Sequence, residues 1–275
     1  MRLRETLAHA AARRGDAIAP GAFSWLFTLS ALCAALGIGL FAIDGSHQIG
    51  FVPFNALARP APDWLLANLT EVGNTAVLVA VALVTARRHP QLLIALVVAV
   101  LFGAIVINVL KDAFAVPRPP AVLDPQSFRL VGDAHQRGSF PSGHTFATFS
   151  VAAIALGFVT QPMARLSIII GAVCVACARV WVGVHWPLDL VGGAFGGLLT
   201  GALALAVSRH WHGGFHPFAH LAMVSVAVLS NVVLIIGGTN YAAADPLMRT
   251  VALASTLVVA WQYLRPTPGP TAPTE

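Results

Sequence analysis

The sequence is short of charge and holds a single lysine, Lys111. Only 10% of its 275 residues are Asp, Glu, Lys or Arg, whereas 57% are hydrophobic and the mean hydropathy is +0.78. Soluble domains carry about 25% charged residues, so this composition excludes an ordinary soluble fold. We therefore expect an all-α integral membrane protein.

The sequence also lacks the usual marks of metal binding and of nucleic-acid binding. Its three cysteines, Cys33, Cys174 and Cys177, all lie in apolar runs, and we interpret the CVAC spacing as small packing residues rather than a metal or redox site. The formal net charge is +5, but no basic cluster with interleaved aromatic residues is present, so we expect no nucleic-acid partner.

Several apolar runs are long enough to cross a bilayer, whose hydrocarbon core of about 30 Å requires roughly 20 residues of helix. Six are well defined and two are weaker, and the last is short enough that it could instead lie partly in the membrane interface. These runs predict one membrane domain over residues 1–275, a bundle of six to eight transmembrane helices. In order, the runs are 23–43, 64–86, 91–110, 144–160, 166–184, 189–207, 221–238 and 250–264.

Basic residues predict the orientation of this bundle. Residues 1–20 are basic, and the first apolar run is too long for the core of a cleavable signal peptide, so we expect a cytoplasmic N-terminal segment followed by an anchor. The short loop ARRHP then also lies inside, in agreement with the positive-inside rule. The long connection 112–141 faces the periplasm or the exterior, and the polar, proline-rich tail 265–275 is predicted to be disordered.

Three short segments carry the side chains that could bind or react with a substrate. The predicted orientation places all three segments at the outer surface. They read KDAFAVPRP, PSGH and ARVWVGVHWPLD. The residues of interest are Lys111, Arg118, Ser142, Gly143, His144, Arg179, His185 and Asp189.

Five of these residues suit the binding of a phosphoryl group. Its anionic oxygens require fixed positive charge, which Lys111, Arg118 and Arg179 supply, and an arginine fork matches them geometrically. Ser142 and Gly143 fall where the fourth span should begin, and a helix N-terminus offers free N–H groups to an anion. The sequence therefore predicts a phosphate site at the membrane surface.

The histidines and the aspartate suit the transfer of that group. Asp189 follows His185 by four residues, so its carboxylate can fix one ring nitrogen and leave the other free to attack phosphorus. His144, beside the anion-binding turn, is placed to protonate the leaving oxygen. This arrangement predicts a phosphohistidine intermediate and no metal or other cofactor, because the cations stabilise the charge.

The three segments resemble the signature of the type 2 phosphatidic acid phosphatase superfamily, which also includes the vanadium haloperoxidases. The resemblance implies a six-helix membrane core over about 64–207, with 208–264 as two additional spans. It implies His185 as nucleophile, Asp189 as its partner, His144 as proton donor and the other five residues as phosphate ligands, without a metal. Ala178 stands where the family usually has serine, which removes a hydroxyl next to Arg179. The haloperoxidase branch is soluble, so the membrane composition favours the lipid phosphatase branch.

The resemblance is compatible with several functions. The substrate implied is a membrane lipid phosphate or diphosphate, and undecaprenyl diphosphate, phosphatidylglycerol phosphate and phosphatidate are the candidates. A phosphotransferase that passes the group to a second lipid, for example lipid A, is an alternative, and so is a non-catalytic lipid-binding or transport protein. We expect the protein in the inner (cytoplasmic) membrane, with its site on the periplasmic or extracellular side.

Other polar or small residues in the apolar runs also have more than one interpretation. Glu71 could face the site, reach the headgroups or pair within the bundle. Two overlapping GxxxG patterns in 189–207 favour close packing within the bundle, with homodimerisation as the alternative. Asn231 suits an interhelical hydrogen bond, and Trp181 and Trp186 suit interface anchors or the substrate entry. The histidine run suits an interfacial belt better than a metal site; it comprises His210, His212, His216 and His220.

Overall fold

The computed structural model describes residues 3–44 and 47–265, and within them the chain is helical and has no strand. This confirms the predicted all-α class. The helices are α1 (Leu3–Arg13), α2 (Ala22–Asp44), α3 (Phe51–Ala56), α4 (Asp63–Glu71), α5 (Thr75–Leu83), α6 (Pro90–Phe114), α7 (Pro119–Val122), α8 (Gly143–Phe158), α9 (Pro162–Trp181), α10 (Pro187–His210), the 3₁₀ helix η1 (His212–Phe215), α11 (Pro217–Gly237) and α12 (Asp245–Leu264).

Six of the described helices are long and apolar enough to cross a membrane, namely α2, α6, α9, α10, α11 and α12. Both weak candidates of the sequence therefore correspond to helices of sufficient length, α11 with 21 residues and α12 with 20. Helix α8 is also apolar but shorter, with 16 residues. Residues 266–275, most of the tail predicted to be disordered, lie outside the described part of the chain.

The predicted span 64–86 is not one continuous helix. Helices α4 and α5 are separated by a break at which the chain bends by 65°. The side chain of Asn74 caps α5 by accepting a hydrogen bond from the backbone N of Ala76 at 3.0 Å, which starts a new helix rather than continuing the old one. Gly73 lies so close to α9 that a Cβ there would meet Val175 Cγ1 at 2.7 Å. The bend therefore presses the backbone against the neighbouring helix.

Helices α8 and α10 pack closely at the centre of the bundle because one face of α10 is lined with glycines. A Cβ at Gly193 would lie 2.8 Å from Ser142 O, and a Cβ at Gly197 would lie 2.5 Å from Phe146 O. At Gly201 it would lie 2.4 Å from the Cβ of Ala153. These glycines thus pack against α8 of the same chain, as the packing interpretation of GxxxG proposes. Dimerisation stays a prediction.

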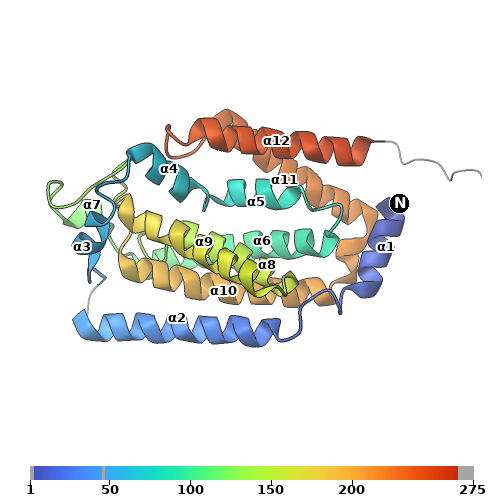
Figure 1. Ribbon diagram of the computed structural model, residues 1–275, viewed down its shortest axis with the longest axis horizontal. Coiled ribbons are helices and arrows are strands. Elements are labelled where there is room, and N and C mark those ends of the chain that lie inside the picture. The colour runs from blue at the N-terminus through green and yellow to red at the C-terminus, as the bar shows by residue number, and fades with distance from the viewer. Residues whose placement is uncertain (1–2, 45–46, 266–275) are drawn as a thin grey trace, which may run out of the picture.

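The bundle has two distinct ends (Figure 1). At one end lie α3, α7, the last turn of α9 and the first turn of α10, whereas α1 and the end of α12 lie at the other. Helices α2 and α12 flank the bundle on opposite sides. Between α11 and α12, Asn231 Nδ2 donates to Thr256 Oγ1 at 3.1 Å and to Ala252 O at 3.3 Å, which is the interhelical bonding expected of it.

Candidate active site

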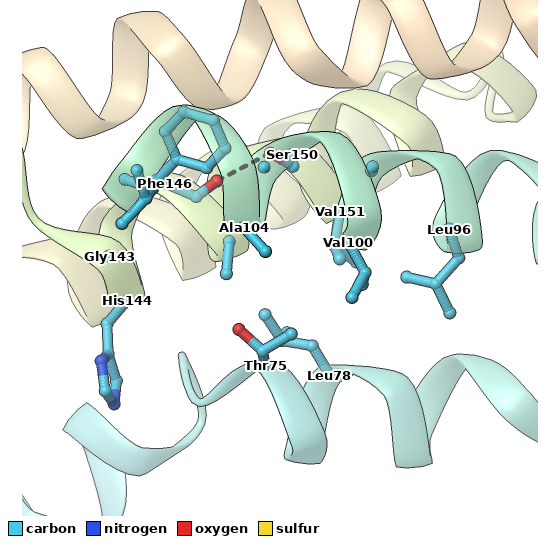
Figure 2. A pocket seen from close by; sticks show the side chains of 14 residues that line it. Thr75, Leu78, Leu96, Val100, Ala104, Gly143, His144, Phe146, Ser150 and Val151 are labelled. Carbon is cyan, nitrogen blue, oxygen red and sulfur yellow. Dashed lines mark hydrogen bonds between the residues drawn. The ribbon is translucent and has the colours of Figure 1, made fainter. Parts of the chain in front are cut away.

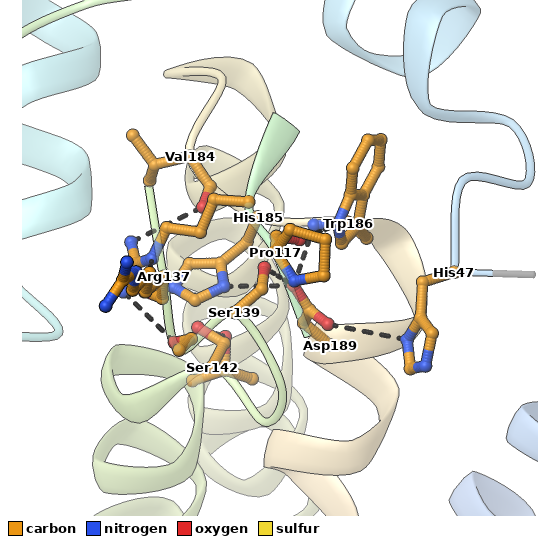
Figure 3. Close-up of polar contacts among 12 residues, drawn as sticks. His47, Pro117, Arg137, Ser139, Ser142, Val184, His185, Trp186 and Asp189 are labelled. Atoms are coloured by element: carbon orange, nitrogen blue, oxygen red, sulfur yellow. Dashed lines mark hydrogen bonds and ion pairs between the residues drawn. The ribbon is translucent and has the colours of Figure 1, made fainter. Parts of the chain in front are cut away.

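The three sequence segments meet at the end of the bundle that carries α3 and α7. The backbone N of Ser142 donates to the carbonyl of Asp189 at 3.1 Å, which joins the start of α8 to the first turn of α10. Arg118 Nη1 donates to the carbonyl of Val184 at 3.4 Å, which joins the segment after α6 to the loop between α9 and α10. Residues far apart in the sequence therefore surround one small volume (Figure 3).

His185 is held by a carboxylate, as its spacing predicts. Its Nδ1 lies 3.1 Å from Asp189 Oδ2, and the two residues are 1% and 0% exposed. The same carboxylate oxygen accepts hydrogen bonds from Ser139 Oγ at 2.5 Å and from the backbone N of Trp186 at 2.9 Å. With Nδ1 directed at the carboxylate, Nε2 is the ring nitrogen left free for chemistry.

The two arginines of the site are buried and held by different groups. Arg118 Nε donates to the carbonyl of Arg137 at 3.0 Å, which fixes its guanidinium against the long loop. Arg179 comes from the last turn of α9, and its Nη1 donates to Thr70 Oγ1 at 2.6 Å. Its Nε is buried and has no partner within the described chain.

Lys111 lies in the last turn of α6, and its methylene groups run past Gly138. A Cβ at Gly138 would lie 3.5 Å from Lys111 Cδ. Lys111, Arg118 and Arg179 all lie close enough to His185 for their charges to act on its titration.

Two imidazoles outside the spans report this field of positive charge. Burial lowers the pKa of His185 well below its usual value, and the charges of Arg118, Arg179 and Lys111 lower it further. Burial followed by the charges of Arg118 and Arg179 likewise lowers the pKa of His135, in the loop between α7 and α8. At neutral pH His185 is therefore an uncharged imidazole, the form that can act as a nucleophile.

The PSGH segment forms the N-terminus of α8. Ser142 is the N-cap residue, and its Oγ accepts a hydrogen bond from Thr145 Oγ1 at 3.1 Å. A Cβ added at Gly143 would meet nothing within 4 Å, so open space lies in front of this turn. His144 follows, and its Nε2 is 3.7 Å from Glu71 Oε1 at the end of α4. Glu71 is 0% exposed and faces this site, which decides between the interpretations that the sequence left open.

An apolar groove of about 260 Å³ leads from His144 between α5, α6 and α8. Figure 2 shows His144 at one end and Leu78, Val100 and Leu96 further along. The site thus has a polar, cationic end and, starting at His144, a groove lined chiefly by hydrocarbon.

Sequence reasoning missed several residues at the site. Ser139 and Thr70 hold Asp189 and Arg179, and His47 Nδ1 lies 3.8 Å from Asp189 Oδ1. None of the three belongs to a spacing that indicates a function, although Ser139 lies within three residues of Ser142.

The interpretation of Trp186 as an interface anchor or entry residue is wrong. Its side chain is 1% exposed, and its Nε1 donates to the carbonyl of Pro117 at 2.7 Å. It packs against Phe51 at a ring-centroid distance of 5.0 Å, so it forms part of the core beneath the site.

The histidine run lies at the other end of the bundle, where three of its members have separate partners. His220 Nε2 lies 2.6 Å from Tyr263 Oη, His212 Nε2 lies 2.7 Å from Arg14 Nη2, and His216 Nδ1 accepts from the backbone N of Phe218 at 3.3 Å. Among the residues that the structure describes, no group of three His, Cys, Asp or Glu side chains could hold a metal ion.

Comparison with known proteins relates this arrangement to one family. The sequence model of the PAP2 superfamily matches residues 92–213, which include every residue of the three segments. An undecaprenyl-diphosphatase of Sulfolobus acidocaldarius is 29% identical over 180 residues, 62% of this chain and 84% of the relative. A lipid A 1-phosphatase of Rhizobium etli is 30% identical over 200 residues, 64% of this chain and 85% of the relative. The crystal structure of Aquifex aeolicus LpxE superposes with a TM-score of 0.52 at 25% identity, covering 57% of this chain and 92% of that one.

Proposed function

This chain belongs to the PAP2 superfamily and is a phosphatase, and we propose that it hydrolyses a membrane lipid phosphate or diphosphate through a phosphohistidine on His185. The observation that carries the proposal is the convergence of three cations, a helix N-terminus and a carboxylate-bound imidazole beside an apolar groove that starts at Gly143 and His144. We assign the catalytic core to residues 64–207, with α11 and α12 as additional helices.

The arrangement supports two chemical steps. In the first, Lys111, Arg118 and Arg179 hold the phosphoryl oxygens while His185 Nε2 forms a bond to phosphorus. The bond from phosphorus to the leaving oxygen breaks, and His144 gives its proton to that oxygen, which an alkoxide leaving group needs far more than a phosphate leaving group does. In the second, water attacks phosphorus, gives a proton to His144 and releases inorganic phosphate and a neutral His185. Asp189 Oδ2, 3.1 Å from His185 Nδ1, holds His185 in the reactive tautomer throughout.

The groove supports a lipid as the substrate. Its lining between α5, α6 and α8 is chiefly hydrocarbon, so it suits an acyl or isoprenoid chain whose phosphate lies beside His144. Within this class we propose an isoprenoid diphosphate such as undecaprenyl diphosphate first, supported by the Sulfolobus relative. Phosphatidylglycerol phosphate and phosphatidate follow.

A lipid A-directed activity is the second candidate, because the Rhizobium etli relative is named a lipid A 1-phosphatase. It includes transfer of the phosphoryl group from His185 to another lipid instead of water. Hydrolysis and transfer differ in a measurable product. A hydrolase releases inorganic phosphate without an acceptor lipid, whereas an obligate transferase does not.

We propose that the site opens on the periplasmic or extracellular side of the inner membrane. The basic end of the molecule, with Arg13, Arg14, Arg87 and Arg88, then faces the cytoplasm. A lipid substrate would reach the groove by lateral diffusion in the outer leaflet.

The decisive experiment measures phosphate release by the purified protein from undecaprenyl diphosphate, phosphatidylglycerol phosphate, phosphatidate and lipid A, each with and without EDTA. We expect at least one lipid to be hydrolysed, with unchanged rates in chelator, and His185→Ala to abolish release while the protein remains folded in detergent. Full activity of His185→Ala would contradict the assigned nucleophile. Loss of activity in EDTA would contradict the metal-free mechanism.

A further inference from the structure

Glu71 is a carboxylate enclosed by the bundle next to the site. It is the last residue of α4, and its side chain is 0% exposed. Its Oε2 accepts a hydrogen bond from Asn74 Nδ2 at 2.8 Å, whereas its Oε1 has no hydrogen-bond partner in the described chain. An ionised carboxylate in such a place is costly unless it is paired with a positive group. The group that its free oxygen faces is His144 Nε2, at 3.7 Å.

We propose that Glu71 is a positioning residue for His144, which keeps Nε2 of the ring directed at the bend between α4 and α5 and favours the charged imidazolium. The proposal rests on the proposed function, because it assigns to Glu71 the support of the proton donor in that mechanism. It extends that function by giving each histidine its own carboxylate: Asp189 serves the nucleophile and Glu71 serves the acid.

The burial of the ring atoms supports this orientation. His144 Nε2 is buried and makes no hydrogen bond within the described chain, although 19% of the side chain is exposed. Nδ1 is therefore the nitrogen left toward the open space in front of the α8 N-terminus, where the phosphate would lie. A ring fixed by a carboxylate on one nitrogen presents its proton from the other. The separation of 3.7 Å is longer than a hydrogen bond, as is common for catalytic contacts without substrate.

The break between α4 and α5 is what brings Glu71 to this position. A continuous helix would carry the chain past the α8 N-terminus, whereas the bend lets Gly73 approach it: a Cβ there would lie 3.3 Å from the Cβ of His144. Asn74 both caps α5 and holds Glu71 Oε2, so the same residue fixes the bend and the carboxylate. The local structure thus aims one oxygen of Glu71 at His144.

A purely structural or electrostatic role would have a different consequence. Glu71 also lies near the charge of Arg179 and could simply balance it. In that case its loss would weaken phosphate binding or folding, and every substrate would suffer equally. Support of a proton donor matters only when the leaving group needs a proton.

The test therefore compares two substrates with the same tail and different leaving groups, farnesyl phosphate and farnesyl diphosphate in detergent micelles. The first expels an alkoxide, which needs a proton, whereas the second expels a phosphate monoester whose second pKa is about 6. For Glu71→Gln we expect kcat on the monophosphate to fall by about 10- to 100-fold, part of the roughly 10²- to 10⁴-fold that general acid catalysis provides. We expect kcat on the diphosphate to change by less than about 3-fold and the two KM values to stay similar.

Two further variants separate positioning from folding. Asn74→Asp keeps a side-chain oxygen to cap α5 but replaces the amide that donates to Glu71 with a second carboxylate. We therefore expect kcat on the monophosphate to fall more than kcat on the diphosphate, by less than in Glu71→Gln. Asn231→Ala removes a buried polar group between α11 and α12, far from the site, and should leave the ratio of the two rates unchanged.

The outcomes distinguish this proposal from the proposed function. Equal losses on both substrates in Glu71→Gln, or no loss on either, would overturn the role of Glu71 while leaving the phosphatase intact. Wild-type activity on the diphosphate alone would also overturn it, because no reaction that needs an acid would remain. Activity of His185→Ala on either substrate would instead contradict the proposed mechanism itself.

Discussion

At the scale of single residues, the chemistry depends on how the site treats His185. Burial and three neighbouring cations hold its pKa well below the usual value, so the imidazole remains neutral and nucleophilic as the pH falls. The same cations serve as phosphate ligands in the proposed mechanism. One set of charges therefore binds the substrate and keeps the attacking group uncharged.

This double role predicts the pH dependence of Arg118→Gln. Removing the charge raises the pKa of His185, so the protonated, unreactive form appears at higher pH and the acid limb of kcat/KM moves upward. At neutral pH we expect kcat/KM to fall by about 10- to 100-fold, because a charge-assisted hydrogen bond to phosphate contributes about 1.5–3 kcal/mol. Both effects are measured from initial rates of phosphate release between pH 4.5 and 8.

The matched control is Arg59→Gln, an exposed arginine outside the site that should change neither the rate nor the pH profile. Titration of the substrate shifts both variants alike, so the difference between their profiles isolates the protein group. An acid limb that stays in place in Arg118→Gln would show that this arginine does not act on the nucleophile.

The residues of the three motifs could be found from the sequence because the spacing that their chemistry requires can be read from the sequence. His185 and Asp189 are one helical turn apart, and Lys111, Arg118 and Arg179 are rare charges at the ends of apolar runs. Thr70, Ser139 and His47 lack such a signal, because each acts on a partner that only the fold brings near. In the sequence such residues look like any other threonine, serine or histidine. Their role is recognised only from the contacts that the structure shows.

At the scale of elements, hydropathy predicts where helices run but not where they break. The run 64–86 is apolar enough to be one span, and Glu71, Gly73 and Asn74 change its average little. Asn74 caps α5 from within this run, but the close approach of Gly73 to α8 and α9 depends on contacts that the sequence of 64–86 does not contain. In contrast, the small-residue pattern of α10 predicted close packing correctly. Glycines without side chains let a neighbouring helix approach closely, whichever helix that is.

The packing of α10 on α8 predicts the effect of Gly197→Ala. The added Cβ would lie 2.5 Å from the carbonyl oxygen of Phe146, a backbone atom that cannot move alone, so the two helices must separate. Because α8 begins with the PSGH segment and α10 begins beside His185, the separation also displaces the proton donor from the nucleophile. We expect a loss of about 1–3 kcal/mol in stability, seen as a lower Tm in detergent, together with a lower kcat.

Gly171→Ala on α9 is the control, since a Cβ there meets nothing within 4 Å and alanine is the better helix former. It should keep the Tm and the activity of the parent protein. A Gly197→Ala protein with unchanged Tm and rate would show that the spacing of α8 and α10 is not limiting.

At the scale of the whole molecule, the two ends of the bundle carry different chemistry. One end gathers the phosphate site and the loop between α7 and α8, whereas the other holds α1, η1 and the paired arginines Arg87 and Arg88. Basic segments stay in the cytoplasm, so the site should face away from it.

This orientation is tested by single cysteines introduced at the two ends, in a background where Cys33, Cys174 and Cys177 are replaced by alanine and phosphatase activity is retained. Ala134→Cys lies in the exposed loop near the site, and Ala8→Cys lies on the exposed face of α1. We expect a membrane-impermeant maleimide to label Ala134→Cys in intact cells and Ala8→Cys only after the membrane is permeabilised. Labelling in the reverse order would place the site in the cytoplasm and would supply its lipid from the inner leaflet. Equal labelling of both in intact cells would mean that the ends do not lie on opposite sides, and would contradict the bundle as a set of membrane-crossing helices.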